Sequence, residues 1–432
     1  KGLSASTSSL NIAYSMPVLL SKLGIKCSIQ HVNGGRVVRF PTKLSRTHEW
    51  WIVRIYEKNY DLSKESKTKV SVIEKEEIES LVEGYDLEKV SIGTLGSHSA
   101  LNIFKGAKEE GFRTVCVCTQ SREIVYRKFQ LVDEFIFVER FSDLLNGEIQ
   151  ERLRELNTIL VPHGSFNAYI GMEGMLNDLY VPMFGNRRLL KWEVNRDKQR
   201  EWLRKAGLRL PKTYESPNDI DKLVIVKFPG ARGGKGYFLA DSPETFRRKA
   251  EDMIKRGHLK REELSNVQLQ EYILGVTAYF QYFRSIIEED VELLGMDRRY
   301  ESTVDGLGRI PARDQLQVDL NPTYTVVGNI PLTLRESLLP EVLSMGDRVA
   351  EVSEEIAPPG IIGPFCLEAI ITDTGEIYAF EISARIVAGS NVGIGTSPYA
   401  YLKYGAGMYM GRRIAREIKE GIRRGVLKKI IY

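Results

Sequence analysis

Short apolar runs alternate with segments of helical periodicity through the first half of the chain. Residues 100–110 place Leu101, Phe104 and Ala107 on one face of a predicted helix, and Gly111 follows where helices commonly end. Strands are predicted at residues 89–95, 114–118, 134–138, 158–161 and 181–184. Strands separated by helical segments predict a parallel sheet, so this part of the chain is expected to be an α/β domain.

The first 69 residues have a different composition. Residues 1–48 contain seven Lys or Arg residues and no acidic residue, and residues 4–9 are rich in serine. A targeting peptide has such a composition, but Asn11 and Pro17 interrupt the apolar stretch and no cleavage pattern follows. Residues 1–69 are therefore predicted to be an N-terminal extension, either disordered or not native to the enzyme. A Glu-rich amphipathic helix within residues 70–87 is expected to begin the folded enzyme.

Length and composition indicate a multidomain protein of the cytoplasm. A chain of 432 residues is expected to form two or three domains, and it has no apolar run long enough for a membrane span. The net charge of +4 is small and does not call for a nucleic-acid partner. Cys116 and Cys118 lie two apart in a predicted strand, and we interpret them as buried apolar side chains. No cysteine pair has zinc-site spacing or suggests a disulfide framework, which fits a reducing cytoplasm.

Two polar loops follow strands of the predicted sheet, where such sheets bind ligands. The first loop contains Ser97, His98 and Ser99 just before a helix, and the second contains His163 and Ser165. Hydroxyl groups, an imidazole and the backbone N–H groups of a helix start suit a phosphate group. The alternatives are a serine that caps the helix in the first loop and an ordinary turn in the second.

A glycine-rich loop follows the predicted strand at residues 223–228, which carries Lys227. The loop residues that we expect to approach a phosphate chain are Gly230, Arg232, Gly233, Gly234, Lys235 and Gly236. Because residues 237–239 resume a strand, the loop is predicted to be a hairpin that covers a ligand. It differs from a Walker loop, in which the motif opens a helix.

Three glutamates in apolar strands complete the candidate site. Glu271, in the predicted strand 268–273, can bind an adenine amino group or a ribose hydroxyl. Glu368 and Glu381 lie on two strands joined by a turn at residues 373–375, which would place both carboxylates on one face. Buried carboxylates are costly unless they are paired or bind a metal, so this pair predicts Mg²⁺. The alternative is an ion pair with Arg385 or a lysine.

Ten segments together carry a resemblance to a known family. They read IGTLGSHSAL (92–101), GFRTV (111–115), PHGSF (162–166), FGNR (184–187), MDRRYES (296–302), GRIPARDQ (308–315), GNIP (328–331), RESLLP (335–340), GPFCLE (363–368) and EISARIVAG (381–389). The chain resembles the archaeal 5-formaminoimidazole-4-carboxamide ribonucleotide synthetases (the PurP family) of the ATP-grasp superfamily, from about residue 70 to the C-terminus.

The resemblance implies the fold and its division. We expect an α/β protein with an α+β C-terminal part, in which an ATP-grasp fold follows a Rossmann-like domain. The Rossmann-like domain would span residues 70–190 and the ATP-grasp domain residues 191–432. Within the latter we expect a lid at about 215–275 and a metal and acyl-phosphate subdomain at about 276–432.

The resemblance also implies a ligase reaction and the residues for it. Formate, ATP and aminoimidazole carboxamide ribonucleotide (AICAR) would give the formamido product, ADP and phosphate through formyl phosphate. AICAR would be bound by His98, Ser165, Asn329, Ser97 and Ser99. ATP would be bound by Lys227, the residues of the glycine-rich loop, Glu271, Tyr272, Ile273 and Glu301. Glu368 and Glu381 would bind Mg²⁺ or Mn²⁺, and Arg385 would contact the formyl phosphate.

Two departures leave alternatives open. Ser383 stands where many ATP-grasp enzymes have asparagine, although the synthetases that this chain resembles share the serine. Residues 392–397 (VGIGTS) differ from the expected pocket sequence. A paralogous ligase with another acid or amine, or a nucleotide-binding paralogue without turnover, are the alternatives. The family resemblance further implies a homo-oligomer.

Overall fold

The computed structural model describes residues 72–228, 236–315, 317 and 323–432, together with the backbone of four short strands nearer the N-terminus. These strands are β1 (Ser4–Thr7), β2 (Cys27–Asn33), β3 (Arg36–Arg39) and β4 (Trp51–Ile55), which form one sheet in the order β1-β4-β2-β3. The chain divides into two units, Lys1–Ser71 and Val72–Tyr432. Our prediction of disorder in residues 1–69 lies largely outside the described residues.

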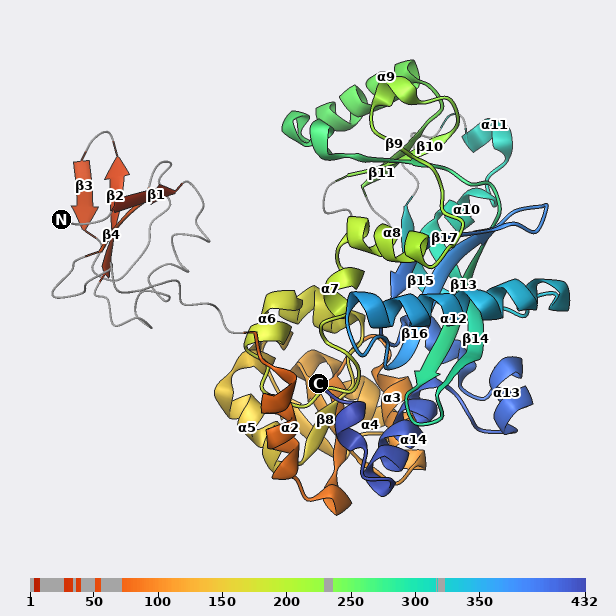
Figure 1. The fold of residues 1–432 in the computed structure, drawn as a ribbon. Helices are drawn as coiled ribbons and strands as arrows, with labels where there is room; N and C mark the ends of the chain where they lie inside the picture. The colour runs from red at the N-terminus through yellow and green to blue at the C-terminus, as the bar shows by residue number, and fades with distance from the viewer. Residues whose placement is uncertain are drawn as a thin grey trace. The chain divides into compact units, whose positions relative to one another are not determined.

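The predicted parallel sheet is present in the second unit (Figure 1). Its strands, in the order β7-β6-β5-β8, are β5 (Ser91–Leu95), β6 (Arg113–Cys118), β7 (Glu134–Phe137) and β8 (Thr158–Leu160). Its helices are α2 (Lys75–Glu83), α3 (Ala100–Glu109), α4 (Glu123–Phe129), α5 (Gly147–Glu155) and α6 (Gly171–Asn177). Alternating strands and helices therefore predicted this layer correctly.

The predicted fifth strand at residues 181–184 is wrong. Among the described residues, this segment makes two isolated bridges, Met183 with Leu160 and Phe184 with Ile431. Pro182 has no N–H to donate, and the Met183 N–H bonds to the carbonyl of Tyr432 instead. The segment therefore runs beside β8 without forming a full ladder.

A second sheet and one helix form the expected lid region. Its strands, in the order β11-β10-β12-β9, are β9 (Thr213–Tyr214), β10 (Val224–Lys227), β11 (Tyr237–Ala240) and β12 (Gln268–Glu271). Helix α9 (Pro243–Lys255) packs on β11 and closes a small apolar core (Figure 1). Strands β10 and β11 pair antiparallel, so the glycine-rich segment between them connects a hairpin as predicted.

A five-stranded antiparallel sheet forms the rest of the second unit. In the order β15-β14-β13-β16-β17, it contains β13 (Val276–Ser285), β14 (Asp290–Thr303), β15 (Tyr324–Pro331), β16 (Gly363–Ile371) and β17 (Ile377–Ser383). Its helices are α10 (Val304–Leu307), α11 (Ala312–Gln315), α12 (Leu339–Ile356), α13 (Pro398–Tyr404) and α14 (Met410–Arg423). Helix α14 packs against α3, so one apolar core joins this sheet to the parallel sheet.

Two helices connect the parallel sheet to the lid region, α7 (Leu190–Glu193) and α8 (Arg196–Lys205). Asn195 has extended backbone angles, and its side chain accepts a hydrogen bond of 3.0 Å from the Lys198 N–H. Asparagine is among the strongest N-terminal caps, so it starts a new helix here. The break leaves Glu193 at the end of α7.

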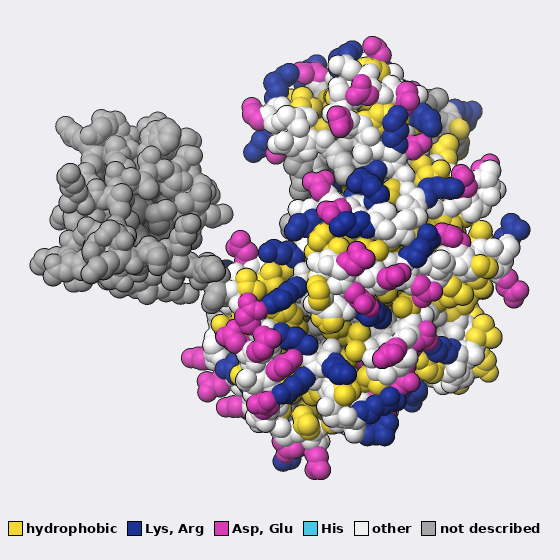
Figure 2. Space-filling model, viewed as in Figure 1, with side chains coloured by type: hydrophobic (Ala, Val, Ile, Leu, Met, Phe, Trp, Pro, Cys, Tyr) yellow, Lys and Arg dark blue, Asp and Glu magenta, His cyan; other side chains and the backbone are white. Residues whose placement is uncertain are grey.

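Surface charge is mixed. Figure 2 shows lysine and arginine side chains interspersed with aspartate and glutamate over the visible face of the described residues. No helix in the described ranges has the length and apolar content that crossing a bilayer requires.

Candidate active site

The two polar loops meet at the carboxyl edge of the parallel sheet. The Ser165 hydroxyl donates a hydrogen bond of 3.0 Å to Ser97 Oγ, which also accepts one of 2.7 Å from Arg122. The rings of His98 and His163 stack with centroids 5.2 Å apart and planes 5° from parallel. The loops that were predicted to share a ligand are therefore in direct contact.

His163 supports this arrangement from a buried position. Its Nε2 lies 3.0 Å from the Leu95 carbonyl, and its Nδ1 accepts the Ser165 N–H at 3.2 Å. These two partners fit a neutral ring with the proton on Nε2. Burial lowers the pKa of His163 to about 3, and the charge of Arg385 adds to that effect.

His98 points into the open side of the loops. Its backbone is in the left-handed region, with φ of 52°, and its side chain is exposed. Loss of hydration lowers the pKa of His98, and the positive charges of Arg385 and Arg299 add to the shift. Ser99 stands at the start of α3 but its hydroxyl makes no capping bond, and it lies 2.6 Å from His98 Nδ1 instead. The capping alternative is therefore wrong for Ser99.

Gly164 brings the second loop against the C-terminal domain. A methyl group added at Gly164 would lie 2.8 Å from His98 Nε2 and 3.5 Å from the central guanidinium carbon of Arg385. A backbone bridge between His163 and Ile386 joins the loop to the segment after β17. The candidate AICAR residue His98 and the candidate acyl-phosphate residue Arg385 thus both lie within 3.5 Å of one point beside Gly164.

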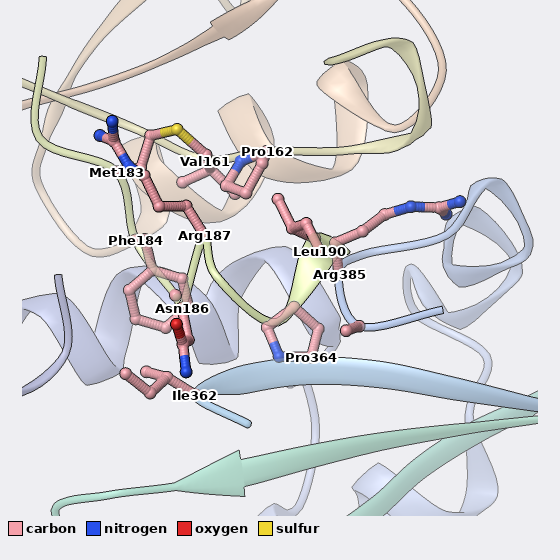
Figure 3. Close-up of a pocket in the computed structure, with 12 residues that line it drawn as sticks. Val161, Pro162, Met183, Phe184, Asn186, Arg187, Leu190, Ile362, Pro364 and Arg385 are labelled. Atoms are coloured by element: carbon pink, nitrogen blue, oxygen red, sulfur yellow. The ribbon is translucent and has the colours of Figure 1, made fainter. Parts of the chain in front are cut away.

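Arg385 pairs with Glu193, not with Glu381 as the alternative interpretation had it. The Arg385 Nε donates to Glu193 Oε1 at 3.1 Å, and Nη2 lies 3.0 Å from the same oxygen. The reason is tertiary: the break after α7 brings Glu193 to the end of β17. Figure 3 shows Arg385 extending away from the other labelled residues of a small pocket, and Arg187 extending to the opposite side.

The predicted pairing of the strands that carry Glu368 and Glu381 is present, and a register shift between Glu368 and Ala369 makes the two glutamates direct cross-strand partners on β16 and β17. Glu368 is buried, but Glu381 is exposed, so the expectation that both are buried is wrong for the second. Glu368 accepts a hydrogen bond from Arg299, whereas its Oε2 is buried and has no hydrogen-bond partner among the described residues. Burial raises the pKa of Glu368 to about 7, and the charge of Arg299 opposes the shift.

This donor set fits a divalent cation. An unpartnered buried carboxylate oxygen beside a second carboxylate is the kind of oxygen ligand that Mg²⁺ binds, with phosphate oxygens and water completing its shell. No group of three His, Cys, Asp or Glu side chains suited to a metal occurs among the residues that the structure describes. The two glutamates can therefore hold a metal only together with a bound phosphate chain or water.

Lys227 lies at the end of β10 facing the same region. Its Nζ donates a hydrogen bond of 2.9 Å to Gln270. Burial lowers the pKa of Lys227 to about 8, whereas the charges of Glu381 and Glu368 raise it. Gly236 takes φ of 84° and its carbonyl accepts the Phe228 N–H at 2.9 Å, which closes the hairpin. The candidates Gly230, Arg232, Gly233, Gly234 and Lys235 lie outside the described residues.

The residues expected to bind adenosine, Glu271, Tyr272 and Ile273, lie at and just after the end of β12. The Glu271 carboxylate accepts the Lys212 N–H at 3.1 Å and lies 3.5 Å from Lys222 Nζ. The Tyr272 N–H bonds to the Leu223 carbonyl, and Ile273 follows the end of β12. Glu271 thus already has protein partners, and its role toward adenosine stays a prediction.

Glu301 and Asn329 lie on neighbouring strands β14 and β15. Burial raises the pKa of Glu301, and Arg299 opposes the shift. The Asn329 amide donates a hydrogen bond of 2.8 Å to Asp297, a buried carboxylate that also accepts a hydrogen bond of 2.5 Å from Gln281. Asp297 therefore fixes the orientation of Asn329.

Sequence reasoning did not single out Glu193, Asp297 or Arg299. The latter two stand inside the MDRRYES segment, so their presence in a family motif was an available signal. Glu193 carried no such signal in the sequence, because it ends a helix of four residues and contacts Arg385, which lies 192 positions further along the chain.

Comparison with known proteins assigns the family. The synthetase "5-formaminoimidazole-4-carboxamide-1-(beta)-D-ribofuranosyl 5'-monophosphate synthetase" of Archaeoglobus fulgidus is 54% identical over 358 residues, which cover 83% of this chain and 99% of the relative. The chain belongs to this synthetase family. The protein of the same name from Methanocaldococcus jannaschii is 52% identical over 360 residues, covering 83% of this chain and all of the relative.

Family profiles and solved structures agree with this assignment. Residues 92–214 match "Protein of unknown function (DUF1246)" and residues 245–432 match "Domain of unknown function (DUF1297)". The crystal structure of the IMP biosynthesis protein PurP from Thermococcus kodakaraensis is 33% identical with a TM-score of 0.62, over 79% of this chain and 100% of that chain. An N5-carboxyaminoimidazole ribonucleotide synthetase solved with ADP is 14% identical with a TM-score of 0.51, over 74% and 76% of the two chains. The latter likeness shows the shared ATP-grasp fold, and the family makes this chain a ligase.

Proposed function

We propose that the chain catalyses the ATP-dependent formylation of AICAR by formate, as the names of its relatives indicate, and releases the formamido product, ADP and phosphate. The observation that carries the proposal is the contact at Gly164. There His98, on the side of the AICAR loops, and Arg385, on the side of the phosphate-binding sheet, lie against one point. An amine bound by the first group can then meet an acyl phosphate bound by the second.

The chemistry needs two steps that share one site. A formate oxygen attacks the γ-phosphorus of ATP, and ADP leaves, which gives formyl phosphate. The AICAR amine then attacks the formyl carbon, phosphate leaves, and the nitrogen loses a proton. The amine is conjugated with its ring and is a weak nucleophile, so close positioning and exclusion of water contribute most of the rate.

The residues of this chain divide between the two steps. Lys227 would bind a phosphate oxygen of ATP, and Arg385 would hold the formyl phosphate through its remaining N–H groups. Ser97, Ser99 and Ser165 would bind AICAR, with His98 beside its amine and Asn329 on the opposite sheet. A neutral His98 can accept a hydrogen bond from that amine. Glu368 and Glu381 would hold Mg²⁺ (or Mn²⁺), which supplies charge neutralisation for the phosphate oxygens.

Three finer proposals accompany the reaction. We place it in the cytoplasm, where formate and ATP are available. We expect small-molecule substrates alone, without nucleic acid or membrane. We also expect a homo-oligomer, as the family resemblance implies.

The test is phosphate release from ATP and Mg²⁺, measured with AICAR and formate together and with each omitted. Release that requires both substrates supports the proposal. Release that requires AICAR but prefers another carboxylate, such as acetate, would replace formate by that acid. ATP binding without release in the presence of any acid would identify a nucleotide-binding paralogue.

A further inference from the structure

Glu193 is a buried carboxylate that the proposed mechanism does not use. Only 6% of its surface is exposed. It ends α7, in the short connection between the parallel sheet and helix α8. A buried carboxylate is costly unless it is fully paired, so its partners show what it is for.

The partners of Glu193 come from both sides of the candidate site. Oε1 accepts from Arg385 and, at 2.9 Å, from the Asn167 amide. Oε2 accepts the Ala384 N–H at 2.9 Å. Asn167 stands two residues after Ser165, in the short helical segment Phe166–Ile170 that follows the second polar loop, whereas Ala384 and Arg385 follow β17. One carboxylate thus joins the acceptor side to the acyl-phosphate side.

The geometry at Arg385 leaves a defined part of the guanidinium for a ligand. Nε and one N–H of Nη2 face Glu193, and one N–H of Nη1 points to the Ile386 carbonyl at 3.3 Å. A guanidinium has five N–H groups in a fixed plane, so two, one on each terminal nitrogen, have no partner among the residues that the structure describes. Such a fork suits two oxygens of an anion.

We propose that Glu193 is a positioning residue: it fixes the Arg385 guanidinium so that its two remaining N–H groups face the acyl phosphate, and through Asn167 it sets that fork relative to the AICAR loop. The proposal rests on the proposed function. Glu193 acts only through Arg385 and does not contact substrate. Its charge strengthens the hydrogen bonds to Arg385 and compensates the charge of the partly buried guanidinium.

A double-mutant cycle tests this. Glu193→Gln keeps the size and the acceptor for the Ala384 N–H but loses the charge. It is expected to lower kcat/KM for formate on the order of 30-fold, with KM for ATP unchanged. In an Arg385→Ala background the same substitution is expected to change kcat/KM less than 2-fold, because its effect passes through the arginine. Equal losses in both backgrounds would overturn the proposal.

Glu292→Gln is the matched control. Glu292 is a second buried glutamate paired with an arginine, Arg413, at 3.0 Å. It lies away from the site, so its substitution is expected to lower thermal stability without coupling to Arg385. If Glu292→Gln were coupled to Arg385→Ala as strongly as Glu193→Gln is, the effect of Glu193 would be a general structural one, and the proposal would be overturned.

A measurement without turnover separates this inference from the proposed function. In protein labelled with ¹⁵N-arginine, the Arg385 Nε–H signal is identified by its loss in Arg385→Lys. Slow solvent exchange in the wild type and faster exchange in Glu193→Gln are expected, and equal exchange rates would overturn the inference. Absence of formate-dependent phosphate release in the wild type would instead count against the proposed function alone.

Discussion

Substituting Gly164 by alanine is the most direct perturbation of the contact between the two halves of the site. The new methyl group would lie 2.8 Å from His98 Nε2 and 3.1 Å from the neighbouring ring carbon, where ordinary contacts begin at 3.4 Å. The imidazole therefore has to retreat by about 0.6 Å, the difference between 3.4 and 2.8 Å. Arg385, at 3.5 Å, is not displaced.

The energetic cost should fall on catalysis and not on folding. His98 is exposed, so its ring can swing outward. Alanine also lowers the conformational entropy of the unfolded chain relative to glycine, which stabilises the folded protein by about 0.4–1 kcal/mol. The free energy of unfolding is therefore expected to change by less than about 1 kcal/mol. Misplacing a positioning group by a fraction of an ångström to an ångström costs up to roughly 100-fold, so we expect kcat/KM for AICAR to fall by about 10- to 100-fold.

The assay is initial-rate phosphate release at saturating ATP and formate with varied AICAR, beside urea unfolding of the same preparations. Gly147→Ala is the control, because a methyl group there meets nothing within 4 Å. Full activity in Gly164→Ala with unchanged stability would refute the reasoning, since it would mean that His98 need not occupy its observed place.

Three further predictions use other parts of the structure. Glu368→Gln is expected to lower Mg²⁺-saturated phosphate release by about 100-fold and raise the Mg²⁺ concentration needed, whereas the exposed Glu83→Gln should do neither. Since burial lowers the pKa of His163 to about 3 from an unfolded value of 6.5, the unfolded chain takes up a proton first as pH falls. Stability should drop by about 2 kcal/mol between pH 7 and pH 5, and His163→Gln should flatten this drop in urea titrations. Trp202→Phe removes the 3.0 Å hydrogen bond to the Val349 carbonyl in the core and should lower the free energy of unfolding by about 1–3 kcal/mol, read from the urea midpoint.

Several features followed from the sequence by itself. Alternating apolar runs and helical periods determined the parallel sheet, because each reports which face of a local element is buried. The short turn at residues 373–375 determined that the strands of Glu368 and Glu381 pair antiparallel, whereas a register shift between Glu368 and Ala369 puts the two glutamates directly opposite each other. The glycine-rich segment between two strands likewise indicated the hairpin of β10 and β11.

Other features were decided only by the tertiary structure. The partner of Arg385 is Glu193, 192 positions away, and no local pattern reports which charged side chains meet when distant elements pack. The same holds for the pairing of Glu368 with Arg299 and for the exposure of Glu381, which lies in an apolar strand yet faces the open side of the sheet. Periodicity fixes the faces of single elements, whereas the long-range packing of α7 and of the loop at residues 162–165 against the end of β17 fixes which polar groups share a site.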